Sequence, residues 1–144
     1  MADLLEQWVF YVQAGMQDQA PFEVRARVEA ANDLMDQVAL LLDDRQIHPV
    51  APMVLTGAAL EERLRALMAE HSVTLSGKAG LDAYRADLRK AGVLDGQEAK
   101  QVTAWAGLRN RGAHGQDLDK LTVSEARIMA DGVNFFLQKH ALAS

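Results

Sequence analysis

The segment Arg109–Gly115 brings several chemically active side chains close together in the chain. It holds the guanidinium groups of Arg109 and Arg111, the amide of Asn110 and the imidazole of His114 within six residues. Histidine titrates near neutral pH and can give or take a proton, whereas arginine stays charged and binds phosphate oxygens through paired donors. These residue types at this spacing predict chemistry on a phosphate group.

The backbone must bend if Arg109 and His114 are to act on the same group. On an unbroken helix, side chains five residues apart point about 140° away from each other. Glycines at positions 112 and 115 predict such a bend, because glycine adopts backbone conformations that other residues avoid. The alternative is structural: Asn110 and Gly112 end a helix, the two arginines complement its negative C-terminus, and His114 lies in a solvated turn.

The segment resembles the signature of the HEPN superfamily, the higher eukaryotes and prokaryotes nucleotide-binding domains. That signature is an arginine, commonly followed by asparagine, and a histidine a few residues later. Here it reads Arg109-Asn110-x-x-x-His114. Sequence similar to that of the family also occurs in three stretches, one of which includes the start of the motif. The resemblance therefore covers roughly residues 34–137. These stretches are Ala58–Arg65, Trp105–Asn110 and Gly132–Leu137.

The resemblance implies a metal-independent endoribonuclease without a cofactor, active on RNA as a homodimer. Each protomer would supply Arg109 and His114 to a shared cleft, and the 2′-hydroxyl of the RNA would attack the neighbouring phosphate. Arg111 and Lys100 are candidate RNA contacts, and Lys78 is a further candidate for binding phosphate. Many members of the family are toxins or phage-defence effectors, which implies an antitoxin or a larger defence complex as a partner. Members silenced by adenylylation often carry tyrosine where this chain has Gln116, so this modification is not expected.

Supporting roles are assigned to Asn110 and to two acidic residues. An amide does not titrate, so Asn110 would orient its neighbours and would not move protons. Glu61 lies on an otherwise apolar helix row, and family members often keep an acid there, which makes it a candidate to orient Arg109 or polarise the motif imidazole. An ion pair between Glu61 and Arg65, four residues on, is an equally good interpretation. Glu62 is the alternative to Glu61 in the same role.

The elements that carry these residues are predicted to be helices throughout. Apolar residues recur at steps of three and four, and the three prolines fall where this pattern pauses. We therefore expect an all-α fold: a single domain over residues 1–144, built as an up-and-down bundle of five or six helices. The resemblance implies that this bundle is HEPN-like.

The first predicted helix carries Leu5, Trp8, Val12 and Met16. The second, of about six turns, lies between Pro21 and Pro49, with one face formed by Val24, Val28, Ala31, Met35, Val38 and Leu42. The third runs from Pro49 or Pro52 to about His71, with Val54, Leu60, Leu64, Leu67 and Met68 inward. The fourth carries Leu81, Tyr84 and Leu88 and ends at Gly92. The fifth runs from the capping box of Asp95 and Glu98 to about Asn110, with Val102, Trp105 and Leu108 on one face. The sixth follows the cap at Thr122 and Glu125, with Ala126, Ala130, Val133 and Leu137 inward.

Three local features refine this prediction. The small residues Thr56–Ala59 indicate that another helix approaches closely, because a glycine inside a helix costs about 1 kcal/mol relative to alanine. The stretch Ser72–Gly80 is the longest predicted loop. Trp105 has the spacing of a core residue, although stacking on a base is the alternative.

Composition and charge limit the possible functions. The 144 residues contain no cysteine, which excludes disulfides, thiolate nucleophiles and cysteine metal sites. No glutamate has the spacing to histidine of a di-iron bundle, and no metal site is expected. The absence of a long apolar run and of a basic leader predicts a cytoplasmic protein without a membrane partner.

The net charge of −5 argues against a non-specific nucleic-acid coat. The charge is uneven, because residues 76–120 carry eight basic and six acidic side chains. A small phosphate site in that stretch therefore remains compatible with the composition. Two other functions stay open: a catalytically silent HEPN-like module that dimerises or binds a nucleotide or a protein partner, and a plain structural bundle.

Overall fold

The computed structural model describes residues 21–115 and 118–142, and within these ranges the chain is helical without a strand. The all-α prediction is confirmed for this part of the chain. The predicted helix with Leu5, Trp8, Val12 and Met16 lies outside the described residues. The helices are α2 (Phe22–Leu42), α3 (Val50–Glu70), α4 (Leu81–Lys90), α5 (Gly96–Ala113) and α6 (Val123–Lys139), with a 3₁₀ turn, η1 (Leu118–Lys120), before the last.

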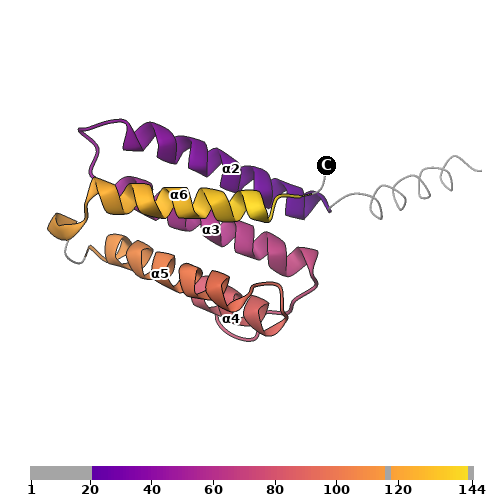
Figure 1. The fold of residues 1–144 in the computed structure, drawn as a ribbon. Helices are drawn as coiled ribbons and strands as arrows, with labels where there is room; N and C mark the ends of the chain where they lie inside the picture. The colour runs from indigo at the N-terminus through magenta and orange to yellow at the C-terminus, as the bar shows by residue number, and fades with distance from the viewer. Residues whose placement is uncertain (1–20, 116–117, 143–144) are drawn as a thin grey trace, which may run out of the picture.

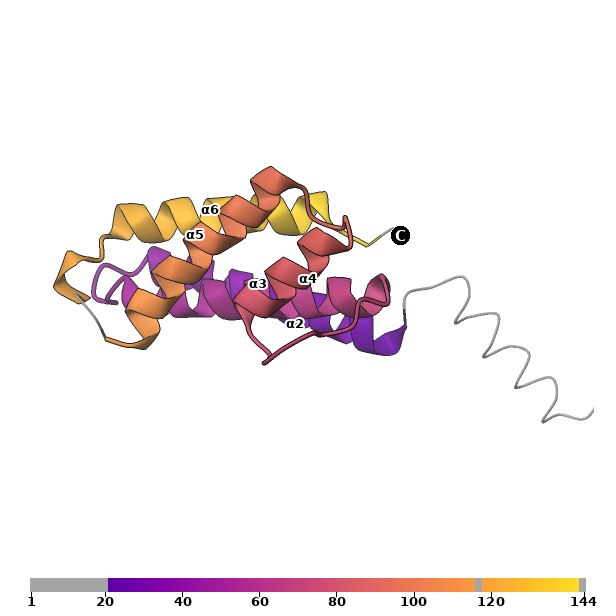
Figure 2. The same ribbon diagram turned by 90° about the horizontal axis from the view of Figure 1, so that it is seen from below.

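These helices form a bundle around α3, which packs against α2, α4, α5 and α6 (Figure 1). α2 and α3 are antiparallel neighbours, and α5 and α6 run antiparallel to each other (Figure 2). The chain runs in nearly the same sense along α3 and α4, because the segment 71–80 first returns alongside α3 (Figure 2). The short α4 therefore interrupts a strict up-and-down alternation.

The apolar faces predicted from the spacing of three and four form the core. Burying one such side chain contributes about 1.5–3 kcal/mol relative to leaving it exposed, so these rows fix which face of each helix turns inward. Four residues of the predicted rows are only half-buried: Val28 and Leu42 of α2, Val54 of α3 and Leu108 of α5. Confirmed core residues include Val24, Ala31, Met35 and Val38 of α2, Leu60, Leu64, Leu67 and Met68 of α3, Leu81, Tyr84 and Leu88 of α4, Val102 of α5, and Ala126, Ala130, Val133 and Leu137 of α6.

Trp105 belongs to this core. Its ring lies edge-on to that of Phe136, with centroids 6.1 Å apart and planes at 75°. A Cβ atom at Gly132 of α6 would lie 2.7 Å from Cζ2 of the indole, so α6 is pressed directly against it. Stacking on a base would require Trp105 to leave this packing.

Local hydrogen bonds set the helix ends near the predicted positions. The Asp95 carboxylate accepts from the backbone N–H of Glu98 at 2.8 Å, and the Glu98 carboxylate accepts from the backbone N–H of Asp95 at 3.1 Å, which completes the predicted capping box. Thr122 caps α6 by accepting from the backbone N–H of Glu125 at 3.1 Å. Gly92, with a φ of 78°, provides the left-handed residue after the end of α4.

The predicted loop over residues 72–80 is held by one carboxylate. Asp87 of α4 accepts hydrogen bonds from the Ser76 hydroxyl at 2.6 Å and from the Ser76 backbone N–H at 2.9 Å. These hydrogen bonds, that of the hydroxyl above all, hold the pKa of Asp87 below its usual value, because they favour the charged form. The loop is therefore anchored to α4.

The C-terminal end of α6 is a junction of three helices. Nε2 of His140, the C-cap residue, lies 2.5 Å from Oε2 of Glu98 at the start of α5, and its ring packs on Phe136 with centroids 4.6 Å apart. The backbone carbonyl of His140 accepts a hydrogen bond from Nη2 of Arg63 on α3. Burial acts to raise the pKa of Glu98, but hydrogen bonds from Asp95 and His140 outweigh it, so that the pKa is lowered. Glu98 therefore remains a carboxylate that can hold the junction near neutral pH.

Candidate functional site

The segment Arg109–Gly115 forms the end of α5 and the turn after it. α5 continues to Ala113, beyond the predicted end near Asn110, and His114 is its C-cap residue with φ −94° and ψ 2°. Gly115 follows with a positive φ of 66°, as the turn requires. Most of the segment is therefore a regular helix.

The predicted bend at Gly112 is wrong. Gly112 lies within α5, where a Cβ atom would be 3.0 Å from Cγ2 of Val50 and 3.3 Å from Cγ2 of Val54. The absence of a side chain lets the end of α5 pack closely on the start of α3. The turn at Gly115 comes after His114, so it does not bring that side chain towards Arg109.

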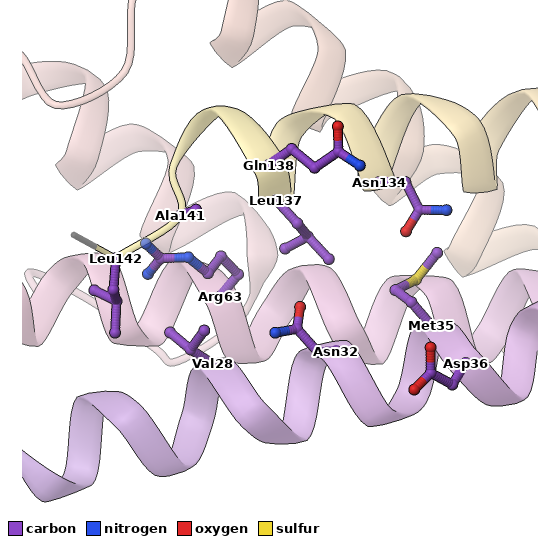
Figure 3. Close-up of a pocket in the computed structure, with 10 residues that line it drawn as sticks. All are labelled: Val28, Asn32, Met35, Asp36, Arg63, Asn134, Leu137, Gln138, Ala141 and Leu142. Carbon is purple, nitrogen blue, oxygen red and sulfur yellow. The ribbon is translucent and has the colours of Figure 1, made fainter. Parts of the chain in front are cut away.

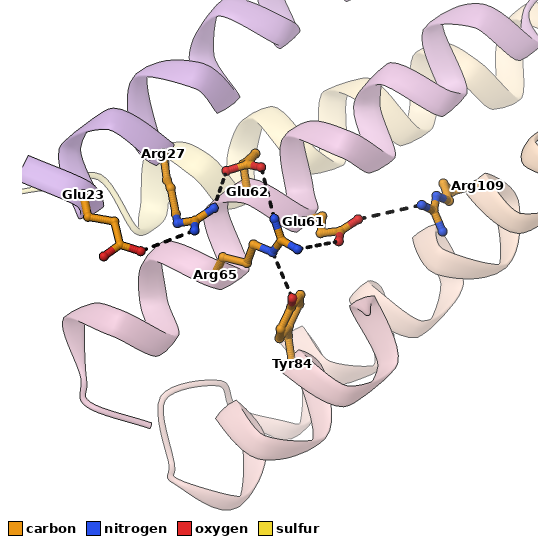
Figure 4. A network of polar contacts seen from close by, with 7 residues as sticks. All are labelled: Glu23, Arg27, Glu61, Glu62, Arg65, Tyr84 and Arg109. Atoms are coloured by element: carbon orange, nitrogen blue, oxygen red, sulfur yellow. Dashed lines mark hydrogen bonds and ion pairs between the residues drawn. The ribbon is translucent and has the colours of Figure 1, made fainter. Parts of the chain in front are cut away.

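Arg109 extends along the surface of α3 at the predicted close approach. A Cβ atom at Gly57 would lie 2.3 Å from Cγ and 2.9 Å from Cβ of Arg109, so the arginine stem occupies the space that the glycine leaves. Its Nη2 lies 3.7 Å from Oε2 of Glu61 (Figure 4). Its Nη1 donates to Oδ1 of Asn110 at 3.4 Å. The guanidinium is thus positioned by both helices, while the side chain remains 35% exposed.

Both predicted interpretations of Glu61 occur in one network (Figure 4). One carboxylate oxygen faces Arg109, and the other lies 3.8 Å from Nη2 of Arg65. Glu62 instead pairs with Nη1 of Arg27 on α2 at 3.1 Å and with Nη1 of Arg65 at 3.6 Å. Of the two acids, Glu61 therefore positions Arg109, and Glu62 links α3 to α2.

His114 is exposed, and its side chain has no hydrogen-bond or ion-pair partner among residues 21–115 and 118–142. Because α5 runs without a break from Arg109 to the cap, the two side chains leave the helix in directions about 140° apart. Glu61 contacts Arg109 and not His114. One copy of the chain therefore does not bring His114 onto the Arg109 guanidinium. Gln116, which stands where some family members carry the modified tyrosine, lies outside the described residues.

The predicted RNA contacts lie apart from Arg109. Nη1 of Arg111 is 3.3 Å from Oε2 of Glu125, so this arginine ties the end of α5 to the first turn of α6. Lys100 is exposed, about 14 Å from Arg109 along α5 at 1.5 Å per residue. Neither side chain adjoins the Arg109 guanidinium.

A hollow of about 260 Å³ adjoins Arg109 and Asn110. Lys78 and the first turn of α4 line its other side, and Gly80 leaves the backbone N–H groups of that turn without a side-chain cap. Arg109, Lys78 and these N–H groups favour an anion, whereas Asp82, which also lines the hollow, opposes one. The sequence identifies Lys78 as a candidate for binding phosphate, and it predicts where α4 begins. It does not predict that both lie near Arg109, because this depends on how α4 packs on α5.

No family model matches the sequence, and no curated protein matches it. The resemblance to HEPN domains therefore rests on the residues quoted above. Among the described residues, no three histidine, aspartate or glutamate side chains gather into a group that could hold a metal ion. None of the described helices is long and apolar enough to cross a membrane.

Proposed function

We propose that the protein is a metal-independent endoribonuclease of the HEPN type, which uses Arg109 and His114 from two copies of the chain. The observation that carries the proposal is the disposition of the motif on α5. His114 is an exposed imidazole without a side-chain partner in the described chain, and Arg109, five residues earlier, is held at the edge of a hollow that Lys78 also lines.

The proposed reaction uses the RNA's own 2′-hydroxyl as the nucleophile. One imidazole removes the hydroxyl proton, the 2′-oxygen attacks the phosphorus, and the bond from phosphorus to the 5′-oxygen breaks. A second imidazole protonates the departing 5′-oxygen, so that the products are a 2′,3′-cyclic phosphate and a 5′-hydroxyl. Arg109 stabilises the charge that builds on the non-bridging oxygens. DNA lacks the nucleophile and should remain intact.

A second copy of the chain supplies what a single copy lacks. Arg109 and His114 point about 140° apart on α5, and the motif offers one histidine per chain. A two-fold axis beside the end of α5 would place the two His114 side chains in one cleft, with the Arg109 guanidinium of each copy at its edges. The proposal therefore requires a homodimer.

The test is cleavage of a labelled single-stranded RNA in EDTA, with the same sequence as DNA for comparison. His114→Ala should lower the rate by about 10²–10⁴-fold, the usual contribution of a general acid or base. His71→Ala is the matched control, because His71 is also an exposed helix C-cap outside the motif, and it should cleave like the wild type. Equal cleavage by the wild type and His114→Ala, or no cleavage by either, overturns the proposal.

A catalytically silent HEPN-like module is the second candidate function. The contact between Arg109 and Glu61 favours it, because an arginine paired within its own chain can serve the packing of α5 on α3 without any reaction. In this case Arg109→Ala lowers the Tm, or the affinity for a partner, and the wild-type protein does not cleave RNA.

A further inference from the structure

A pocket of about 460 Å³ lies between α2 and α6, with α3 as its floor (Figure 3). None of the motif residues lines it. Its walls combine apolar side chains with three carboxamides and two charged groups. The two charged groups lie towards opposite ends of the pocket (Figure 3). The polar groups are Asn32 and Asp36 of α2, Arg63 of α3, and Asn134 and Gln138 of α6.

Arg63 has unused hydrogen-bond donors beneath this pocket. Its side chain is only 1% exposed. Nη2 donates to the carbonyl of His140 and lies 3.5 Å from Oε2 of Glu70, but Nε and Nη1 have no hydrogen-bond partner. A guanidinium carries one hydrogen on Nε and two on each terminal nitrogen, so three donors remain unpaired. Leaving buried charged donors unpaired is costly, and an acceptor that reached them would gain charge-assisted hydrogen bonds.

The charges around the pocket select the kind of acceptor. Glu70 already offsets much of the charge of Arg63, and Asp36 adds a negative charge farther along the pocket. A phosphate dianion would therefore enter a region without a positive surplus. A molecule that carries both a carboxylate and a cationic group adds no net charge, and it can satisfy Arg63 and Asp36 together.

The dimensions indicate how far apart these two groups must be. Val28 lies near Arg63, and Asp36 follows it by eight residues on α2, which corresponds to about 12 Å at 1.5 Å per residue. An extended peptide spans about 3.3–3.6 Å per residue, so about three residues fit this distance. Asn32 lies between the two charged ends, and Asn134 lies across the pocket from Asp36 (Figure 3). Both are exposed carboxamides, which can donate to and accept from peptide groups.

We infer that this pocket binds a short zwitterionic peptide, with its terminal carboxylate on Arg63 and its amino group towards Asp36. The site is independent of the proposed ribonuclease function. Ala141 and Leu142, which follow the end of α6, lie next to the guanidinium (Figure 3). Nε and Nη1 of Arg63 are buried in this structure. Binding of the peptide therefore requires the chain after α6 to move aside before the carboxylate can reach them.

Calorimetric titration of the full chain with the tripeptide Ala-Leu-Ala tests the inference without any mutation. Saturable binding is expected for the peptide with free termini, and at least about tenfold weaker binding for its C-terminal amide, which loses the charged acceptor. Binding of the amide with the same affinity as the acid overturns the inference, as does a lack of binding at millimolar peptide. Binding of inorganic phosphate without binding of the peptide also overturns it, because the site would then select a simple anion.

Variants locate the binding in the pocket. Asp36→Asn should weaken binding of the free peptide, but leave the already weaker binding of the N-acetylated peptide unchanged. Asp33→Asn is the matched control, because Asp33 is also exposed on α2 but does not line this pocket. This variant should bind the free peptide with the affinity of the wild type. Arg63→Met should remove the preference for the acid over the amide. If that variant does not fold, Asp36→Asn still decides, and an unchanged affinity for the free peptide contradicts the site.

Discussion

Gly57→Ala should destabilise the protein, although alanine is the better helix former. The position lies in the middle of α3, where the Arg109 stem crosses it. A methyl group there would be 2.3 Å from Cγ and 2.9 Å from Cβ of Arg109, whereas carbon atoms pack well at about 3.5–4.0 Å. Both atoms are close to the backbone, so relief requires a new rotamer of Arg109 or a movement of α5.

Two opposing effects determine the size of the change. Alanine in place of glycine within a helix gains about 1 kcal/mol. Overpacking a tight contact typically costs about 1–3 kcal/mol, and two contacts under 3 Å place this site towards the upper end. The expected net loss in the free energy of unfolding is about 1–2 kcal/mol, which for a chain of this size lowers the Tm by roughly 3–8 °C.

Urea unfolding followed by circular dichroism measures this difference, with Gly107→Ala as the matched control. Gly107 is an exposed residue within α5, and a Cβ atom there would meet nothing within 4 Å, so alanine should stabilise the protein by up to about 1 kcal/mol. In an Arg109→Ala background the Cγ contact is gone, and Gly57→Ala should cost less. Stabilisation by Gly57→Ala equal to that by Gly107→Ala would refute the close approach of α3 and α5.

Thr122→Ala should lower the free energy of unfolding by about 1 kcal/mol in urea titrations, whereas Thr122→Ser, which keeps the hydroxyl acceptor, should not. Ser76→Ala should destabilise the protein at neutral pH by removing a hydrogen bond to Asp87. The pKa of Asp87 is lower in the folded protein than in the unfolded chain. The stabilisation of the fold by the Asp87 carboxylate is therefore present above the unfolded pKa of about 3.9, and it is lost as the pH falls through the folded-state pKa. The free energies of unfolding of wild type and Ser76→Ala, measured in urea, should therefore converge at low pH. Gly132→Ala would place a methyl group 2.7 Å from the indole of Trp105, and should cost about 1–3 kcal/mol in the same titrations and shift the tryptophan fluorescence.

The helix faces were predictable because burial imposes a period on the sequence. The spacing of Val24, Ala31, Met35 and Val38 identifies the inward row of α2 without knowledge of its neighbours. The close approach at Gly57 was predictable too, because a glycine amid small residues leaves room for another helix. The partner in that space was not, since the sequence does not specify which side chain crosses α3.

Other features depend on contacts that local patterns do not contain. Glycine at position 112 predicts a bend, yet this residue is helical because α5 packs on Val50 and Val54. Arg63 lies on the inward side of α3, whereas charged residues on helices are usually exposed. Its burial depends on the end of α6, far away in the sequence, where the His140 carbonyl accepts one of its hydrogens.

The junction at His140 has a consequence for how the molecule opens locally. Terminal helical turns usually fray, and their amide hydrogens exchange with solvent much faster than those of the core. The last turn of α6 is held by the contact of the His140 ring with Glu98 and by the hydrogen bond from Arg63 to its carbonyl. Deuterium uptake there should be nearly as slow as in the middle of α6. The C-terminal turn and the start of α5 should then gain deuterium together, as one cooperative unit.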